Sequence, residues 1–392
     1  MKIAHVITRM IIGGAQENTL FTVQGLREYE SYQDVDLITG PTTGPEGNLI
    51  EYRGLKEGRD YILVPELVRN IHPFKDAAAF FKLWKIFRKK KYDIVHTHSS
   101  KAGILGRLAA WAAGVKIIVH TIHGQPFHEY QSSLLNAVYV FLEKLAAKVS
   151  TKIVTVCRVM EEKSLEKGIG KKGLFVTIYS GMDLDSFLNA SREREKMREK
   201  LGIRPDEIVI GKIARLFHLK GHDFLFEAVS RIDKENSRIR VLLIGDGILK
   251  EHLEKKAEEL GIRDALIFAG LVMPDDIPLY ISAMDILVHV SLREGLARAL
   301  PQAMAAGVPV VSFDVDGARE VVENGENGYL VEACDVPMLA QAISTLIRDA
   351  EFRKRFGQYG RLKVDPIFRK EFMVRKINDL YMELMENGTR SR

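Results

Sequence analysis

Short apolar runs alternate with amphipathic, helix-length segments along the whole chain. Residues 3–8 form the first apolar run, and a turn containing Gly13-Gly14 leads from it into a helical segment near residues 17–29. The same strand–turn–helix pattern starts again at residues 208–214. Because strands that alternate with helices build parallel sheets, the pattern predicts an α/β protein and disfavours a sandwich or a helical bundle.

Length and a change in composition divide the chain. With 392 residues it is too long for one compact core and suits two domains of roughly 180–200 residues. Residues 191–200 are dense in charge and poor in apolar side chains, which places a boundary near residue 188. We therefore predict an N-terminal domain over residues 1–187, a C-terminal domain over 188–366, and a C-terminal helix with a short tail over 367–392.

The composition is that of an ordinary globular protein, with 46% hydrophobic and 28% charged residues. No apolar run reaches the roughly 18–20 residues needed to span a bilayer, no signal peptide opens the chain, and Cys157 and Cys334 have no metal-ligand spacing. These features favour a cytoplasmic protein with reduced cysteines. The net charge of +5 fits an anionic ligand or an anionic membrane surface. Nucleic-acid binding is disfavoured, because basic and aromatic residues do not interleave on one predicted sheet face.

Residues 285–313 form the most informative stretch. An apolar strand at 285–290 leads into a loop with Glu294, a helix follows near 298–306, and a second apolar strand covers 308–313. This order puts Glu294 at the carboxyl end of a parallel strand beside a helix N-terminus, which is where open α/β sheets bind ligands. A glutamate in this position also fits a helix cap, so the position alone leaves both roles open.

Two further turns contain candidate ligand-binding residues. Arg215 and Lys220 lie in the turn after strand 208–214, where fixed positive charges beside backbone N–H groups suit a diphosphate; two cations in a turn also fit a solvated surface. In the first half, Gly13-Gly14 permits close approach of a phosphate to a helix start, and it equally fits a tight βα turn. That turn lacks the full glycine spacing of a nicotinamide dehydrogenase.

Five histidines gather near predicted strand ends in the first half of the chain. They lack a carboxylate or thiolate at ligand spacing, so we predict no metal site and expect each ring except that of His123 to be packed and hydrogen-bonded. His123 differs from the others, because it leaves a strand end directly before Gly124. The five are His96, His98, His120, His123 and His128.

The stretch that begins at Glu294 resembles the signature of glycosyltransferase family 4. That signature has a Glu, seven residues, a second Glu, and then Ala-Met-Ala and Gly-x-Pro-Val-Val. The chain has Ala303-Met304-Ala305 and Gly307-Val308-Pro309-Val310-Val311, with Gln302 in place of the second Glu. The resemblance extends over nearly the whole chain.

Members of this family are retaining, nucleotide-sugar-dependent enzymes with the GT-B fold. The resemblance therefore implies two Rossmann-like parallel-sheet domains that face each other across a cleft, with a C-terminal helix that crosses back to the N-terminal domain. It also implies that the C-terminal domain binds the nucleotide-sugar and that the N-terminal domain binds the acceptor. No metal and no other cofactor is expected, because the nucleotide-diphosphate sugar is a co-substrate.

The resemblance also implies roles for individual residues. Arg215 and Lys220 would stabilise the departing diphosphate, while Glu294 would bind hydroxyls of the donor sugar. His123, in Thr121-Ile122-His123-Gly124, would contact the same sugar. The implied catalytic residues are His123, Glu294, Arg215 and Lys220, and the implied donor-binding residues are Gly14, Arg215, Lys220, Gly245, Val272, Glu294, Gly295, Leu296, Ala297 and Gln302.

Two positions depart from the family pattern. Gln302 keeps an acceptor oxygen for the ribose hydroxyls but lacks the charge of Glu, which weakens that bond by about 1 kcal/mol. Ala297 stands where family members have the second glycine of Gly-Phe-Gly. Because alanine accepts a positive φ poorly, we expect the loop at residues 295–297 to differ in shape. We expect an active enzyme that tolerates Gln302.

The acceptor is less visible in the sequence. Residues 96–103 resemble bacterial transferases of capsule and exopolysaccharide assembly, which extend lipid-diphosphate-linked sugars at the inner face of the cell membrane. The resemblance implies a saccharide or lipid-linked acceptor contacted by His98 and Lys101. The segment 76–91 is predicted as an amphipathic helix that packs on the core, and its basic end also suits anionic lipid. A GT-B-fold sugar-nucleotide epimerase or phosphorylase and a non-catalytic nucleotide-sugar-binding protein remain as alternatives.

Overall fold

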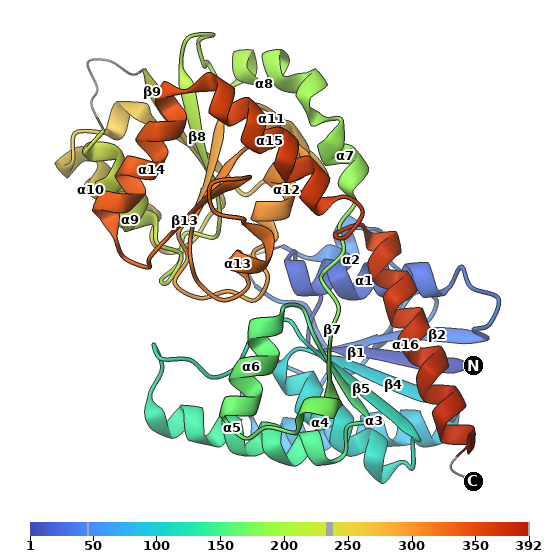
Figure 1. The fold of residues 1–392 in the computed structure, drawn as a ribbon. Helices are drawn as coiled ribbons and strands as arrows, with labels where there is room; N and C mark the ends of the chain where they lie inside the picture. Colours follow the sequence, from blue (N-terminus) through green and yellow to red (C-terminus); the bar gives the residue numbers. More distant parts are fainter. Residues whose placement is uncertain (45–46, 233–237, 391–392) are drawn as a thin grey trace. The chain divides into compact units, whose positions relative to one another are not determined.

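The computed structural model describes residues 1–44, 47–232 and 238–390. The chain forms two compact units (Figure 1). Unit 1 comprises Met1–Gly181 together with Lys370–Arg392, and unit 2 comprises Met182–Arg369. Each unit is built around one parallel sheet with helices on its faces, so the prediction of two Rossmann-like parallel-sheet domains is confirmed.

The sheet of unit 1 has seven parallel strands in the order β3-β2-β1-β4-β5-β6-β7. In its centre, His5 of β1 pairs with His96 of β4, and His98 of β4 pairs with Thr121 of β5. The strands are β1 (Lys2–Ile7), β2 (Asp34–Thr39), β3 (Ile62–Leu63), β4 (Ile94–His98), β5 (Ile117–Ile122), β6 (Lys152–Thr155) and β7 (Phe175–Thr177).

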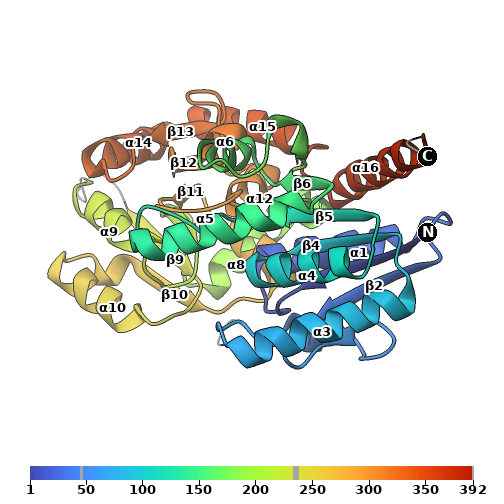
Figure 2. The same ribbon diagram turned by 90° about the horizontal axis from the view of Figure 1, so that it is seen from below.

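Side chains alternate along these strands, so each face of the sheet has its own core. Ala4 and Val6 pack in the layer of α3 (Pro73–Lys90) and α4 (Ser100–Ala112), and α4 in turn contacts α5 (Ser133–Lys148) (Figure 2). Ile3 and Ile7 face the opposite layer. That layer contains α1 (Gly14–Leu26) and α16 (Lys370–Arg390), and unit 1 also includes α2 (Leu49–Tyr52) and α6 (Arg158–Glu166).

Helix α16 belongs to unit 1 although it is the last element of the chain. Met373, Ile377 and Tyr381 are buried in the same core as Ile3 of β1. The predicted return of a C-terminal helix to the N-terminal domain is therefore confirmed. The helix extends to residue 390, and residues 391–392 lie outside the described part.

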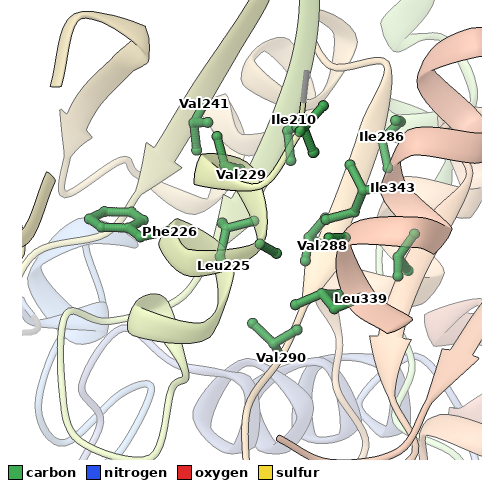
Figure 3. Close-up of a cluster of buried hydrophobic side chains, with 14 of the residues drawn as sticks. Ile210, Leu225, Phe226, Val229, Val241, Ile286, Val288, Val290, Leu339 and Ile343 are labelled. Atoms are coloured by element: carbon green, nitrogen blue, oxygen red, sulfur yellow. The ribbon is translucent and has the colours of Figure 1, made fainter. Parts of the chain in front are cut away.

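The sheet of unit 2 has six parallel strands in the order β10-β9-β8-β11-β12-β13. Its core joins Ile210 and Val288 of the sheet to Leu225 and Ile343 of flanking helices (Figure 3). The strands are β8 (Ile208–Ile213), β9 (Ile239–Ile244), β10 (Leu266–Gly270), β11 (Ile286–His289), β12 (Val310–Phe313) and β13 (Gly328–Val331). The helices are α7 (Leu184–Leu188), α8 (Arg194–Lys200), α9 (His222–Ser230), α10 (Lys250–Glu259), α11 (Ile277–Ser282), α12 (Ala299–Ala305), α13 (Ala318–Val321), α14 (Val336–Arg348) and α15 (Ala350–Val364).

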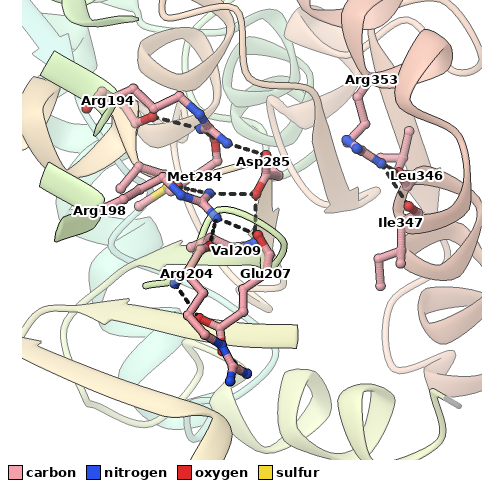
Figure 4. Close-up of polar contacts among 12 residues, drawn as sticks. Arg194, Arg198, Arg204, Glu207, Val209, Met284, Asp285, Leu346, Ile347 and Arg353 are labelled. Carbon is pink, nitrogen blue, oxygen red and sulfur yellow. Dashed lines mark hydrogen bonds and ion pairs between the residues drawn. The ribbon is translucent and has the colours of Figure 1, made fainter. Parts of the chain in front are cut away.

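A carboxylate fastens helix α8 to the amino-terminal edge of this sheet. Asp285 accepts hydrogen bonds from Arg194 at 2.5 Å, from Arg198 at 3.2 Å and from the backbone N–H of Val209 at 2.8 Å (Figure 4). Three donors thus satisfy one carboxylate. The charge-dense segment at residues 191–200 is therefore an integral part of unit 2.

Candidate active site

At the carboxyl-terminal edge of the unit 2 sheet, a lysine and a glutamate from two different loops form an ion pair. Lys220 follows β8 and Glu294 follows the neighbouring strand β11. The Nζ atom of Lys220 lies 2.5 Å from Oε1 of Glu294, and the two side chains are 20% and 22% exposed. The pair is partly shielded from water, where charges interact more strongly than in bulk solvent, and it remains open to a ligand.

Close packing of the backbone brings these two loops together. Gly221 has a φ of +69°, and a Cβ atom at this position would lie 1.8 Å from the carbonyl oxygen of Val290. Beside it, the N–H of Leu292 donates to the carbonyl of Leu219 at 2.8 Å. Only glycine fits at position 221, because a side chain would push the Lys220 turn away from the Glu294 loop.

The main chain of Glu294 is fixed by Asp316, which follows β12. The N–H of Glu294 donates to Oδ2 of Asp316 at 2.7 Å. Asp316 has a left-handed φ of +51°, a conformation that non-glycine residues adopt rarely and Asp more readily than most. The sequence prediction missed this residue. The available signal was an Asp-Gly pair, Asp316-Gly317, directly after a strand, which is typical of a tight turn.

Electrostatics keep the Glu294 side chain ionised. Burial alone would raise the pKa of its carboxyl group, but the charge and hydrogen bond of Lys220, together with the charge of His289, outweigh burial and bring that pKa down to about 2. Nε2 of His289 lies 3.6 Å from the same carboxylate oxygen. Because burial lowers the pKa of His289 to about 4, its imidazole is neutral at pH 7 and this contact is not an ion pair.

Three buried basic side chains of unit 2 were also missed by the sequence prediction. Lys212, His222 and His289 are almost inaccessible to solvent. Among the described residues, Lys212 Nζ, His222 Nδ1 and His289 Nε2 have no hydrogen-bond partner. Burial, followed by the charge of Lys220, lowers the pKa of Lys212 to about 7, and burial and the charge of Lys212 lower that of His222 to about 2. For Lys212, the signal available in the sequence was a lysine inside an otherwise apolar strand.

Arg215, Gly245 and Val272 also follow strands of this sheet. The guanidinium carbon of the exposed Arg215 lies 4.9 Å from the centre of the Phe217 ring. Gly245 has a φ of +135°, and a Cβ atom there would lie 2.1 Å from the carbonyl oxygen of Ala214. The turn after β9 therefore packs directly on the backbone of the Arg215 turn. Val272 comes two residues after β10.

Residues 295–297 connect Glu294 to the segment that enters α12. Gly295, Leu296 and Ala297 are buried, and none of these three described residues has a positive φ. Ala297 therefore fits the loop without backbone strain, although family members have glycine there. Gln302 is half-buried in the first turn of α12, and its N–H donates to the carbonyl of Arg298 at 3.1 Å.

In unit 1, Gly14 and His123 lie near the carboxyl-terminal edge of their own sheet. Gly14 is the first residue of α1, the helix that follows β1. His123 directly follows β5, and its Nε2 atom lies 3.1 Å from Nδ1 of His98. The expected hydrogen bonding of His98 is thus present in the structure, with His123 as its partner.

His98 and Lys101 are not placed as direct acceptor ligands would be. His98 has no accessible surface, and its second ring nitrogen lies 3.0 Å from Nδ1 of His5. Nζ of Lys101 donates to Oδ1 of Asp76 at 2.6 Å and also to the carbonyl of Asn70. Burial argues against direct contact of His98 with an acceptor, and Lys101 would have to exchange its ion pair to reach one.

Comparison with known proteins identifies the family. Residues 13–178 match the family described as Glycosyl transferase 4-like domain, and residues 193–363 match Glycosyl transferases group 1. An enzyme of Escherichia coli, UDP-Gal:alpha-D-GlcNAc-diphosphoundecaprenol alpha-1,3-galactosyltransferase, is 32% identical over 397 residues, which cover 99% of this chain and 98% of that protein. The chain belongs to the group 1 glycosyltransferases. The predicted family and the prediction of a transferase enzyme are therefore confirmed.

Further relatives of this glycosyltransferase agree in family and fold. The capsular polysaccharide biosynthesis glycosyltransferase CapM of Staphylococcus aureus is 26% identical, over 82% of this chain and 84% of CapM. Anabaena Alr3699/HepE in complex with UDP matches the structure with a TM-score of 0.82 at 22% identity, over 98% of this chain and 100% of that one. WaaG, a glycosyltransferase involved in lipopolysaccharide biosynthesis, matches with a TM-score of 0.73 at 16% identity, over 96% of this chain and 99% of WaaG. These likenesses confirm the GT-B fold.

Proposed function

We propose that this glycosyltransferase is a retaining enzyme that moves a hexosyl residue from a UDP-sugar to a saccharide on a lipid diphosphate, during assembly of a cell-surface polysaccharide. The observation that carries the proposal is the Lys220–Glu294 pair, a fixed cation and a fixed carboxylate at the ligand-binding edge of unit 2. The name of the Escherichia coli relative states a UDP-galactose donor and a diphosphoundecaprenol-linked acceptor. HepE has been solved in complex with UDP-glucose, which supports the same class of donor.

Departure of the nucleoside diphosphate places negative charge on the β-phosphate. Arg215 and Lys220 supply positive charge for that phosphate from one turn, beside the backbone at Gly245. Charges that are already in position act most effectively on a charge that develops in the transition state. This scheme gives the role of phosphate clamp to side chains of the protein and uses no metal ion.

Glu294 is the group that binds the donor sugar in this scheme. An ionised carboxylate accepts hydrogen bonds from sugar hydroxyls more strongly than a neutral group does. Its partner Lys220 therefore has two functions, because it keeps Glu294 ionised and also faces the phosphate. Backbone amides at residues 295–297 assist Glu294, and Gln302 accepts hydrogen bonds from the ribose hydroxyls.

The acceptor attacks the anomeric carbon on the face from which the diphosphate leaves. The bond from that carbon to the phosphate oxygen breaks, a bond to the acceptor oxygen forms, and the departing phosphate takes the acceptor proton. No protein base is required. A glycoside hydrolase would instead need two carboxylates that flank the bond. Of the two carboxylates that meet in this loop, Asp316 accepts from the backbone of Glu294, which leaves Glu294 for the donor.

Unit 1 contributes its own set of residues to the proposal. We assign contact with the donor sugar to His123 and a backbone N–H for the diphosphate to Gly14, as the family resemblance implies. The acceptor is assigned to unit 1 as well. Lys101 is retained as a ligand for the acceptor phosphate, because that anion would take the place of the Asp76 carboxylate. His98 is not retained as a direct ligand.

We further infer that unit 1 binds an anionic membrane surface, at the inner face of the cell membrane. None of the described helices combines the length and apolar composition needed to cross a bilayer. Helix α5, however, exposes an apolar stripe that consists of Leu134, Val138, Phe141 and Leu145, with Leu134 76% and Phe141 65% exposed. These positions are spaced by four, three and four residues, so they lie on one face of the helix.

The side of α5 that faces the protein carries one buried carboxylate, Glu143, beside the buried Ala146 and Ala147. Oε2 of Glu143 accepts from Nη2 of Arg107 on α4 at 2.6 Å, and both side chains are buried. The long side chains of the apolar stripe nevertheless remain exposed, although an amphipathic helix normally buries such side chains. Helix α3, on the other side of α4, ends in the exposed cations Arg88, Lys89 and Lys90. An exposed apolar stripe and exposed cations on the same unit suit anionic lipid.

A thermal-shift screen of UDP-, GDP-, ADP- and dTDP-sugars, with and without EDTA, tests the donor. We expect stabilisation by a UDP-sugar that EDTA does not change. Turnover is then measured with a GlcNAc-diphospholipid acceptor, and the anomeric configuration of the product is read by NMR. Conversion of the donor without acceptor would indicate an epimerase, a requirement for free phosphate would indicate a phosphorylase, and binding without turnover would indicate a non-catalytic protein. An inverted product would contradict retention.

Flotation with anionic vesicles at low salt tests the membrane surface. Leu134→Glu is expected to abolish flotation by placing a charge in the apolar stripe. Leu362→Glu is the matched control, because Leu362 of α15 is a similarly exposed leucine, 77% against 76%, in unit 2. Equal flotation of the two variants, or none of the native protein, would contradict the inference.

A further inference from the structure

Five buried side chains of unit 1 and the half-buried His123 form one continuous run of hydrogen bonds, which we call the histidine chain. His123 Nε2 lies 3.1 Å from His98 Nδ1, and His98 Nε2 lies 3.0 Å from His5 Nδ1. His5 Nε2 lies 3.4 Å from the hydroxyl oxygen of Tyr381. That oxygen lies 2.5 Å from His96 Nδ1, and His96 Nε2 lies 2.6 Å from Oγ1 of Thr121.

The fold explains why these residues meet. His5 on β1, His96 and His98 on β4 and Thr121 on β5 occupy neighbouring strands, and the alternation of side chains puts all four on one face of the sheet. That face is covered by α16, which supplies Tyr381. The chain therefore begins at His123, the residue assigned to the donor sugar, and depends on a helix from the far end of the sequence.

Apart from His123, the titratable members of the histidine chain are neutral at pH 7. Burial lowers the pKa of His5 to about 3 and brings those of His96 and His98 well below the usual range for histidine. Burial likewise raises the pKa of the Tyr381 hydroxyl. A neutral imidazole has one N–H donor and one acceptor nitrogen. A ring that accepts a hydrogen bond at one nitrogen therefore donates one from the other, and the hydrogen bonds on its two sides run in the same direction.

With His123 neutral as well and with Tyr381 donating its hydroxyl proton within the chain, only two arrangements of protons satisfy every link. In the first, His123, His98, His5 and His96 all hold their proton on Nε2, and the donors run from His123 towards Thr121. In the second, all four hold it on Nδ1, and the donors run the opposite way. A change between the two moves one proton across each link, so each inner member gives up one proton and gains one. His123 and Thr121, at the two ends, must each also exchange a proton with a group outside the chain. No ring can change its tautomer alone without leaving a donor facing a donor.

We propose that the histidine chain sets the tautomer of His123, with His98, His5, Tyr381 and His96 as positioning residues that act through it. The tautomer of a histidine is fixed by the hydrogen bond that its other nitrogen makes. The chain thus decides whether Nδ1 of His123 is a donor or an acceptor. The effect of this tautomer on catalysis rests on the proposed role of His123 at the donor sugar. The claim that the four histidines share one tautomer does not depend on that role.

A metal ion is the competing explanation. The candidate ligand atoms of His5, His96 and His98 lie within 4.8 Å of one another, which suits a transition metal. In the structure, however, both ring nitrogens of each of these histidines already have a partner within the chain. A metal would have to break several of those hydrogen bonds, so the contacts favour the histidine chain.

Long-range 1H–15N NMR of the 15N-histidine-labelled protein tests the proposal without donor or turnover. We expect His5, His96, His98 and His123 to be neutral and to share one tautomer. A mixed set of tautomers would overturn the proposal, and so would stoichiometric metal in the purified protein together with metal-shifted resonances of these rings. The same experiment remains decisive if the enzyme proves to use another donor or no donor at all.

Tyr381→Phe removes the hydroxyl that joins His5 to His96 and keeps the ring. We expect the His123 resonances to shift or split, and kcat to fall between about threefold and a hundredfold, which is the range for a misplaced catalytic contact. Tyr32→Phe is the matched control, because the hydroxyl of Tyr32 donates to Oδ1 of Asn378 on the same helix at 2.6 Å and is not part of the chain. Unchanged His123 resonances in Tyr381→Phe would overturn the coupling. If that variant does not fold, the tautomers of the native protein decide alone.

Discussion

The Nζ atom of Lys220 lies 2.5 Å from Oε1 of Glu294, and this contact links the turn after β8 to the loop after β11. It also determines the charge of the site, because Lys220 keeps the carboxylate ionised. The first prediction concerns this pair. Glu294→Gln keeps the shape of the side chain and removes its charge. We expect kcat/KM to fall roughly 100-fold, as for other groups that stabilise a transition state through fixed hydrogen bonds.

The same variant changes the dependence of stability on acid. The pKa of Glu294 is about 2 in the folded protein against 4.5 ordinarily, so its contribution to stability is complete above pH 4.5 and is lost as the pH falls towards 2. The shift of 2.5 corresponds to about 3 kcal/mol in the free energy of unfolding. Urea unfolding at pH 5 and pH 3 should show a smaller loss in Glu294→Gln than in the native protein. Glu323→Gln, at another Glu–Lys pair of unit 2, is the control. An equal loss in all three proteins would disprove the assignment.

The second prediction concerns the close approach at Gly221. Gly221→Ala would place a methyl group against the Val290 carbonyl, in addition to the strain of a left-handed φ. Gly202→Ala provides the strain alone, because Gly202 has a φ of +66° and nothing within 4 Å of the new Cβ. We expect about 1–2 kcal/mol of destabilisation for Gly202→Ala and clearly more for Gly221→Ala, with loss of donor binding only in the latter. Equal destabilisation by urea unfolding would show that the loop contact is unimportant.

The third prediction concerns the buried Lys212. Its pKa is lowered from 10.5 to about 7, so between these values the unfolded chain binds more protons and the stability of the native protein rises with pH. Lys212→Met removes the charge and most of the burial penalty. The variant should exceed the native protein in unfolding free energy by on the order of 3–5 kcal/mol at pH 6, and the difference should shrink towards pH 10. Lys196→Met, at an 86% exposed lysine, should show no such trend. A difference that stays constant with pH would mean that Lys212 is charged throughout.

The fourth prediction concerns the glutamine in place of the second signature glutamate. Gln302→Glu should tighten binding of a UDP-sugar about fivefold, which corresponds to about 1 kcal/mol, by restoring a charged acceptor for the ribose hydroxyls. Gln302→Ala should weaken it by a similar factor or more. Calorimetric titration with the donor identified in the thermal-shift screen measures both. Unchanged affinity in Gln302→Ala would remove Gln302 from the ribose site.

Much of the architecture follows from the order of apolar and polar segments. Buried strands that alternate with helices have few topological solutions, which is why both parallel sheets were predictable. The placement of Lys220 and Glu294 at one edge of the sheet follows from the same rule, because each lies in the loop after a strand of one parallel sheet. Their ion pair was not predicted. Asp316 and the tight contact at Gly221 were not predictable, since they depend on φ angles and on backbone distances of a few ångströms.

The histidine chain shows which contacts the strand pattern could predict and which it could not. The spacing of His96 and His98 is that of one sheet face, and the expectation that both are packed and hydrogen-bonded is confirmed. His5 went unnoticed, because a single histidine in a strand has no distinguishing neighbour in the sequence. Tyr381 lies 376 positions from His5, so only the return of α16 brings the two together.

That return has a consequence for how the protein is made. On the ribosome, unit 1 is the first to be started and the last to be finished, since unit 2 is already whole when Arg369 has been synthesised. Until the 21 residues of α16 follow, the sheet face that holds His5 and His96 lacks its cover. Domains generally fold as they are completed during synthesis, so we expect unit 2 to fold before unit 1 closes. A premature stop before Tyr381 would therefore damage the beginning of the protein.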